Sequence, residues 1–340
     1  MSDEKNRIAN RTFGELISDG FRLFAENYTK LILIFAFFYI ISIIIGVFIL
    51  TDLRWYSDIL TAKANIAANK YYNNPNSITQ EDYNIIIQSF FMNLLIILLE
   101  WIIGAIFTVI SMCSVSTFVY KKYFKEDADL FDEFKKAFNF NLLKVILLLG
   151  LGIPLGFILL VFPGIILFLY FIFLIFTYNS ENRDNPISEA RTISKGSYLR
   201  IIGVFFIALI LTGACNMIYL IIISYVWPVN SSDINSWYNP ATRNFGFIIL
   251  YELVNSVILI VFAPLFICLL TPVFASSKAR KDLGIITTEK RINIPMQAYY
   301  PPASQYGVPL NNGMFCPFCG VKIISPKKFC PRCGKSIIFE

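Results

Sequence analysis

The sequence predicts an all-α polytopic membrane protein. Of its 340 residues, 56% are hydrophobic and only 15% are charged, whereas soluble domains are roughly a quarter charged. The mean hydropathy is +0.62. The apolar residues gather in uncharged runs that reach the length of about 20 residues with which a helix crosses a bilayer. Helices are expected because lipid offers no partner to an unpaired backbone group.

The longest of these runs determines the predicted topology. Leu142 to Tyr178 spans 37 residues with a single charge at Lys144. A continuous helix of that length would measure ~55 Å, nearly twice a ~30 Å hydrocarbon core. Pro154 and the triplet Phe162-Pro163-Gly164 lie inside the run, and proline removes a backbone donor and clashes with the preceding turn. We therefore expect two short crossings that fold back at Phe162–Gly164, with both ends on one side of the membrane.

The remaining runs add four crossings, so six transmembrane helices are predicted within a membrane domain of residues 1–282. The segment 51–89 is polar and rich in Asn and Tyr, and we expect a loop there that contains at most a short helix. The predicted spans lie at about 31–50, 93–119, 142–161, 164–178, 201–227 and 246–274.

Amphipathic helices are expected at the membrane interface before the first, third and fifth spans. Thr12 to Glu15 has the spacing of a capping box, and the helix that it opens is expected to end at Lys30. Leu130 to Phe138 carries a second apolar stripe. Asn185-Pro186 resembles an N-cap followed by a first-turn proline, which predicts a third short helix.

The distribution of Lys and Arg orients these spans. Segments 1–30, 120–144, 179–200 and 276–340 carry 5, 6, 4 and 10 of these residues, whereas 51–89 and 227–244 carry 3 and 1. Because cytoplasmic loops are the ones enriched in Lys and Arg, both termini are expected in the cytoplasm and the chain in the cell membrane. A single crossing over 142–178 would instead place the basic segment 179–200 outside.

Composition argues against an enzyme and against a nucleic-acid binder. The chain has no histidine, so the commonest general base and the commonest nitrogen ligand for metals are missing. No aspartate lies in a predicted span, where an intramembrane hydrolase would need paired carboxylates or an activated nucleophile. The net charge of +6 comes from residues that flank the spans, and membrane topology accounts for them.

Several short motifs resemble the multi-span membrane domain found in some glycerophosphoryl diester phosphodiesterases and in stand-alone proteins of unassigned function. The resemblance covers roughly Thr12 to Leu283. In those enzymes a separate barrel of about 250 residues carries the chemistry, and no such domain follows here, so the resemblance implies the membrane domain without the activity. The motifs are Phe13-Gly-Glu-Leu-Ile17, Gly20-Phe-Arg-Leu-Phe24 with Asn27-Tyr28, Phe162-Pro-Gly-Ile-Ile166, Ser188-Glu-Ala-Arg191, Ser194-Lys-Gly196 and Arg200-Ile-Ile-Gly203.

The C-terminal tail carries two Cys-x-x-Cys-Gly pairs with ten residues between them. These are Cys316 with Cys319 and Cys330 with Cys333. Four thiolates form a closed tetrahedral site for structural Zn²⁺, with no open position for catalysis. Two disulfides are the alternative, but a cytosolic tail lies in a reducing compartment. We therefore predict a zinc ribbon over residues 314–340, too small to fold without its metal.

A segment rich in Pro and Tyr, residues 283–313, connects the membrane domain to the predicted ribbon. Its composition predicts a flexible, partly extended linker. A docking peptide for an aromatic groove is the alternative, and a spacer is the preferred interpretation.

Five polar residues in the outer halves of the second, fifth and sixth spans are candidate site residues. Carboxylates inside a span are costly and point to function by default, and no Lys or Arg lies in these predicted spans to pair with them. One hypothesis is a polar cavity open to the outside that binds a cationic or polyol group. The preferred alternative places the glutamates at the interface and lets the asparagines join helices. The residues are Asn93, Glu100, Asn216, Glu252 and Asn255.

Together these patterns predict a non-enzymatic integral membrane protein, a scaffold or partner-recruiting protein with a cytosolic structural zinc ribbon as its interaction module. The alternative function is a transporter or lipid-handling protein that uses the cavity around Glu100 and Glu252. The expected partners are the lipid bilayer and a protein bound by the ribbon, with no nucleic acid. The oligomeric state is left open, a homo-oligomer included.

Overall fold

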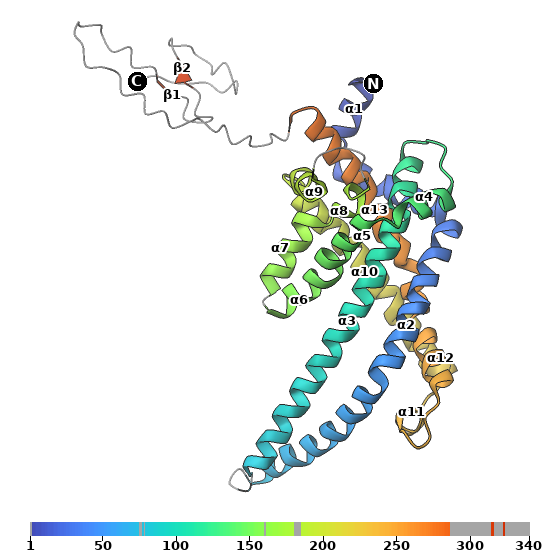
Figure 1. Cartoon of the computed structure of the whole chain (residues 1–340), viewed down its shortest axis with the longest axis vertical. Coiled ribbons are helices and arrows are strands. Elements are labelled where there is room, and N and C mark those ends of the chain that lie inside the picture. Colours follow the sequence, from blue (N-terminus) through green and yellow to red (C-terminus); the bar gives the residue numbers. More distant parts are fainter. Residues whose placement is uncertain are drawn as a thin grey trace, which may run out of the picture. The chain divides into compact units, whose positions relative to one another are not determined.

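The computed structural model describes residues 2–74, 77, 79–159, 161–179, 185–285, 314–315 and 322–323. The chain divides into two compact units, Met1–Thr288 and Glu289–Glu340. The described part of the first unit consists of helices and short connections (Figure 1). Its elements are α1 Ser2–Ala9, α2 Phe13–Asn73, α3 Gln80–Tyr123, α4 Leu130–Ala137, α5 Phe140–Val145, the π-helix η2 Ile146–Leu151, α6 Gly152–Leu159, α7 Val161–Phe171, α8 Leu174–Thr177, α9 Pro186–Ser194, α10 Tyr198–Val226, α11 Ser231–Tyr238, α12 Phe245–Asn255 and α13 Val257–Asp282.

The prediction of a helical protein with several apolar helices long enough to span a membrane is confirmed. Within the described residues, five helical segments are long and apolar enough to cross a membrane, and two shorter apolar segments accompany them. Only 6% of the most apolar window of α10 is buried inside the chain, so that surface is suited to lipid. The five are Phe13–Asn73, Gln80–Tyr123, Phe140–Ile158, Tyr198–Val226 and Val257–Asp282, and the two shorter ones are Val161–Thr177 and Phe245–Asn255.

The prediction that Lys30 ends the first helix and that 51–89 forms a loop was wrong. Helix α2 runs without interruption from Phe13 to Asn73, and α3 begins at Gln80. The two helices lie side by side as a long hairpin (Figure 1). At about 1.5 Å per residue α2 would measure roughly 90 Å if straight, about three times a hydrocarbon core.

Polar contacts between α2 and α3 explain why a hydrophilic segment is helical. Thr61 and Ser89 hydroxyls lie 3.1 Å apart, and Lys70 Nζ donates to Asp82 at 3.1 Å. Thr79 caps α3 and forms a capping box with Asp82. The hairpin therefore pairs its polar groups across the two helices, a tertiary effect that apolar periodicity does not reveal.

The long run 142–178 is split between α5, η2, α6, α7 and α8, and its reversal precedes the predicted one at Phe162–Gly164. Helix α6 ends at Leu159 and α7 begins at Val161. Pro163 thus lies in the first turn of α7, where the amide hydrogen that it lacks would have no helical partner. Pro163 therefore belongs to the start of α7 and does not interrupt α6. The two helices pack closely, because a Cβ on Gly156 would lie 2.9 Å from the Cα of Gly164.

The predicted span 246–274 is also interrupted. Helix α12 ends at Asn255 and α13 begins at Val257, with Ser256 between them. The amide of Ser256 lies 3.1 Å from the carbonyl oxygens of both Glu252 and Leu253. Neither Pro264 nor Pro272, both inside α13, coincides with this break, which the apolar composition of the span did not predict.

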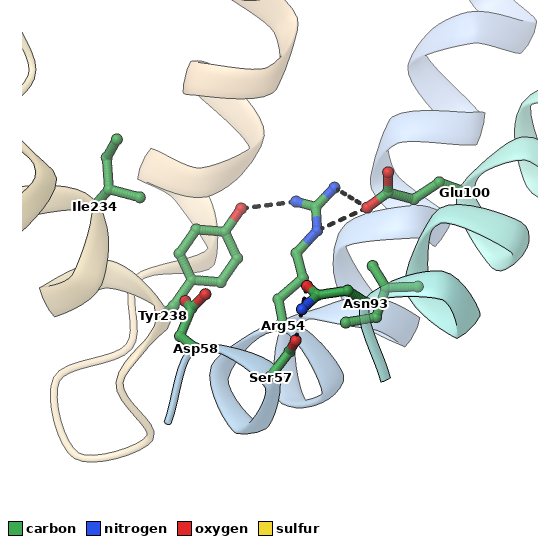
Figure 2. Close-up of a pocket in the computed structure, with 8 residues that line it drawn as sticks. Arg54, Ser57, Asp58, Asn93, Glu100, Ile234 and Tyr238 are labelled. Carbon is green, nitrogen blue, oxygen red and sulfur yellow. Dashed lines mark hydrogen bonds and ion pairs between the residues drawn. The ribbon is translucent and has the colours of Figure 1, made fainter. Parts of the chain in front are cut away.

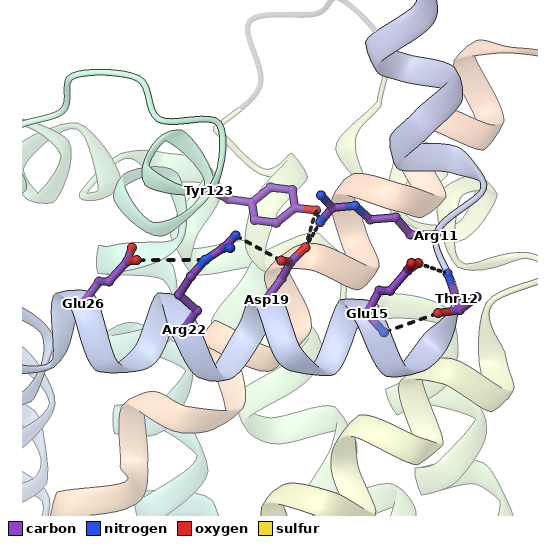
Figure 3. A network of polar contacts seen from close by, with 7 residues as sticks. All are labelled: Arg11, Thr12, Glu15, Asp19, Arg22, Glu26 and Tyr123. Carbon is purple, nitrogen blue, oxygen red and sulfur yellow. Dashed lines mark hydrogen bonds and ion pairs between the residues drawn. The ribbon is translucent and has the colours of Figure 1, made fainter.

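The predicted helix starts are confirmed. Thr12 and Glu15 form the reciprocal capping box of α2 (Figure 3). Asn185 caps α9 through Ile187 N, with Pro186 in the first turn. Helix α4 occupies Leu130–Ala137, the second predicted amphipathic segment.

Helix α13 lies at the centre of the apolar core. It packs against α1, α2, α3, α9 and α10, and Ile267 to Leu270 are fully buried. The approach of α2 is especially close, since a Cβ on Gly20 would lie 2.8 Å from the Cα of Leu269. Glycine is needed at position 20 because any side chain there would push the two backbones apart.

Gly20→Ala is therefore expected to destabilise the protein by about 1–3 kcal/mol, the usual cost of overpacking a core. The matched control is Gly14→Ala in the same helix, because a Cβ at Gly14 would meet no heavy atom within 4 Å. The control should be neutral or slightly stabilising. Thermal unfolding of both variants in detergent measures the difference, and equal melting temperatures would contradict the close α2–α13 contact.

The described part of the second unit is a two-stranded antiparallel ladder. Strand β1 is Met314–Phe315 and strand β2 is Lys322–Ile323, with Met314 opposite Ile323 and Phe315 opposite Lys322.

Candidate functional site

A cluster of charged side chains joins four helices of the first unit at Arg54. Arg54 comes from α2, Glu100 from α3, Tyr238 from α11 and Glu252 from α12. The guanidinium of Arg54 lies between the Tyr238 hydroxyl and the Glu100 carboxylate (Figure 2). Arg54 thereby ties α11 and α12 to the α2–α3 hairpin, and the ion pair of Arg243 with Asp52 and the apolar contact of Val47 with Ile248 add to this link.

Arg54 uses all three of its nitrogens in this cluster. Nε and Nη2 donate to Oε1 of Glu100 at 3.1 and 2.8 Å. Nη1 donates to Oε1 of Glu252 at 2.7 Å and to the hydroxyl of Tyr238 at 2.8 Å. The side chains of Arg54, Glu100 and Glu252 are 26%, 36% and 28% exposed, so these ion pairs are partly shielded from water and stronger than surface pairs.

This arrangement corrects the expectation that the two glutamates have no cation to pair with. Arg54 belongs to the segment predicted to be a loop, but it lies on the continuation of α2, beside Glu100 on α3. The capping box at Thr79 and Asp82 was the available sequence signal that a second helix begins there. Tyr238 was missed because nothing in the sequence indicates that α11 folds back onto α2.

An open cavity of about 310 Å³ lies beside Arg54 (Figure 2). Glu100 and Asp58 present carboxylates to it, and within the described residues no group donates a hydrogen bond to Oε2 of Glu100 or to Asp58. One guanidinium thus stands against three carboxylates when Glu252 is included, a local excess of negative charge. The lining residues are Arg54, Ser57, Asp58, Asn93, Ile96, Glu100, Ile234 and Tyr238.

Asn93 lines the cavity, but its amide is occupied by neighbours. It accepts from Ser57 Oγ at 3.0 Å and donates to Thr61 Oγ1 at 3.2 Å and to the Ser89 carbonyl at 3.0 Å. In this position Asn93 joins the two helices of the hairpin, which is the role that the preferred sequence interpretation gave to the asparagines.

The structure brings Asn93, Glu100 and Glu252 to this region and does not connect Asn216 or Asn255 to it. Neither of these two asparagines lines the cavity. Oδ1 of Asn216 is buried without a hydrogen-bond partner among the described residues. Asn255 is the last residue of α12, at the break before Ser256.

The cluster is suited to binding and poorly suited to acid–base chemistry. Burial raises the pKa of Tyr238, although the charge of Arg54 opposes the shift. The hydroxyl therefore stays protonated at neutral pH, and it accepts from Arg54. The carboxylates of Glu100 and Glu252 are both salt-bridged to the same guanidinium.

The predicted zinc ligands Cys316, Cys319, Cys330 and Cys333 lie outside the described residues. Among the residues that the structure describes, no group of three or more Cys, Asp or Glu could hold a metal ion. Comparison of the chain with protein-family models, with curated proteins and with solved structures found no match.

Replacing Arg54 should leave two partly buried carboxylates without their cation. We expect Arg54→Met to lower stability by about 2–3 kcal/mol, because an unpaired charge costs more than the ion pair contributed. Adding Glu100→Gln and Glu252→Gln to Arg54→Met should recover much of the loss. Lys63→Met is the control, since Lys63 is an exposed cation on the same hairpin. Thermal unfolding in detergent measures all of these, and failure of the triple variant to recover would show that lost packing, not unpaired charge, dominates.

Proposed function

We propose that this chain is a non-enzymatic multi-pass membrane protein that holds a cytosolic zinc ribbon at the membrane and recruits protein partners through it. The observation that carries the proposal is the division into a helical unit with five long apolar helices and a separate C-terminal unit that contains both Cys-x-x-Cys pairs. A linker rich in Pro and Tyr lies at the boundary between them. Such a segment lets an attached module search for partners.

Six crossings with both termini in the cytoplasm are part of this proposal. The five long helical segments supply five crossings, and the sixth is the short apolar segment Val161–Thr177, which packs back on α6. The four segments rich in Lys and Arg then all face the cytoplasm, in keeping with the charge bias across membranes. The similarity of the Gly20 and Gly203 motifs to the phosphodiesterase membrane domain is consistent with this arrangement. Both glycines lie where helices touch, Gly20 on Leu269 and Gly203 on Phe13.

The chemistry of the tail supports Zn²⁺ as its metal. Four thiolates match the preference of Zn²⁺ for a closed tetrahedral sulfur site. The pairing of Phe315 with Lys322 brings together the two ends of the six-residue segment that carries Cys316 and Cys319. The bound metal would supply the folding free energy that so small a module lacks. Residues Cys330 and Cys333 would complete the ligand set.

Affinity capture tests recruitment. The intact protein, purified from cells with its partners, should retain proteins that the double variant Cys316→Ser, Cys319→Ser loses, along with about one equivalent of zinc. Cys215→Ser is the matched control, because Cys215 is a lone cysteine in apolar α10. Identical partners in all three samples would refute recruitment by the ribbon, and labelling of a C-terminal tag from outside intact cells would refute the orientation.

A second candidate function rests on the cavity beside Arg54. Its excess of carboxylates favours a small organic cation, and its lining residues come from α2, α3 and α11, on the outer side in the proposed orientation. A carrier or lipid-handling protein could use such a site. This candidate does not depend on the C-terminal unit.

Binding of choline, as a probe cation, separates the two functions. Glu100→Gln should weaken choline binding roughly tenfold, because it removes a charged partner worth about 1–2 kcal/mol. Deleting residues 283–340 should leave that binding unchanged while abolishing partner capture. No detectable binding of choline to the wild type, or equal binding to Glu100→Gln, would remove the second candidate.

A further inference from the structure

Two arginines meet at the opposite end of the helical unit from the Arg54 cluster, where α10 begins and α13 ends. Arg200 is the third residue of α10, and Arg280 lies in the last turn of α13. The two helices pack against each other. Nη1 of Arg200 donates to Oγ of Ser276 at 3.2 Å. Ser276 is four residues before Arg280 on α13, and residues four apart share one face of a helix.

A third arginine nearby is already neutralised. Arg11 forms an ion pair with Asp19 and donates to the Tyr123 hydroxyl at 3.1 Å (Figure 3). Arg22 donates to the same carboxylate at 3.0 Å. Only the backbone of Arg11 reaches Arg200, whose Nη2 donates to its carbonyl at 3.5 Å. Asp19 is thus paired with Arg11 and Arg22, and it also accepts from the Tyr123 hydroxyl at 3.4 Å.

Among the residues that the structure describes, neither Arg200 nor Arg280 has such a carboxylate partner. Nε of Arg280 is buried without a hydrogen-bond partner, and the described residues offer no ion pair to either arginine. The two guanidinium groups interact with each other repulsively. The nearest carboxylates in sequence are held by lysines, Asp282 by Lys5 at 3.0 Å and Glu189 by Lys281 at 3.7 Å, although Oε2 of Glu189 has no partner.

Three serine hydroxyls lie near these arginines. Ser276 is fully buried and accepts from Arg200, so it orients that guanidinium from within the bundle. The hydroxyls of Ser197 and Ser277 lie 2.6 Å apart beside it in sequence. Two guanidinium groups without a carboxylate partner among the described residues match the oxygens of a phosphate. Partial burial of like charges is unfavourable until an anion binds.

We propose that Arg200, which Ser276 orients, and Arg280 form a binding site for a phosphate group at this end of the bundle. The group belongs either to the headgroup of an anionic phospholipid or to a soluble phosphate. Basic pockets between the cytoplasmic ends of membrane helices bind anionic headgroups in this way. The site is independent of the cavity beside Arg54 and of the C-terminal tail.

The test compares the full-length protein in nanodiscs of phosphatidylcholine alone, of phosphatidylcholine mixed with phosphatidylglycerol, and of phosphatidylcholine with added inorganic phosphate. The wild type should melt at a higher temperature with phosphatidylglycerol. Arg280→Gln should melt at least as high as the wild type in phosphatidylcholine, because it removes an uncompensated cation, and should lose the phosphatidylglycerol shift. Its apparent affinity for phosphatidylglycerol should fall roughly fivefold, the effect expected of one arginine at a membrane surface.

Arg22→Gln is the matched control, since it also removes one arginine near this end but one whose side chain is 60% exposed and already paired. It should keep the phosphatidylglycerol shift. Three results would each overturn the proposal. The phosphatidylglycerol shift in melting temperature could be equal in wild type and Arg280→Gln, it could be lost equally in Arg22→Gln, or Arg280→Gln could be destabilised in every condition. Stabilisation by inorganic phosphate would identify a soluble phosphate as a ligand, and stabilisation by phosphatidylglycerol alone a lipid headgroup. Arg280→Lys, which keeps the charge, covers a failure of Arg280→Gln to fold: a reduced shift supports the site and an unchanged shift counts against it.

Discussion

The contact between α2 and α13 at Gly20 and Leu269 is the constraint on which the rest of the helical unit depends. Helix α13 packs against α1, α2, α3, α9 and α10, and its middle turns are fully buried. Lipid provides no hydrophobic driving force between apolar helices, so close backbone approach and dispersion contacts must hold them together. A glycine without a side chain provides that approach. The start of α2 is thereby placed against the core, and Phe13 in turn fills the space above Gly203 on α10.

Away from this core, polar contacts between side chains hold the helices together. The α2–α3 hairpin is joined along its length by Asn93, by the Thr61–Ser89 pair and by Lys70–Asp82. Arg54 extends the same principle to α11 and α12. Such contacts fix which residues face each other, because a shift by one residue would leave charges unpaired. The hairpin is thus specified by charge matching, whereas the bundle around α13 is specified by shape.

The sequence was sufficient for features that depend on local chemistry. Composition and apolar runs predicted a helical membrane protein, and the caps at Thr12 and Asn185 predicted two helix starts. The sequence was insufficient where a structure depends on contacts between residues that are far apart in the chain. Segment 51–89 has no apolar stripe strong enough to predict a helix, and its helical form depends on polar contacts between α2 and α3. Because segment 51–89 was not predicted to be helical, the position of Arg54 was not predicted either. The link that Arg54 forms between Glu100 and Glu252, two candidate residues separated by more than a hundred positions, was missed for the same reason. The break at Ser256 was not predicted, because no proline or glycine lies beside it.

The break at Ser256 has a consequence for how α12 is positioned. Helix α12 is tied to α2 by the Arg54–Glu252 ion pair and to α10 by the Tyr219 hydroxyl, which donates to the Val254 carbonyl at 2.8 Å. Because the helix is interrupted at Ser256, these contacts, and not the axis of α13, set the direction of α12. Helix α12 is therefore positioned by its contacts with α2 and α10, and α13 by the bundle that packs around it.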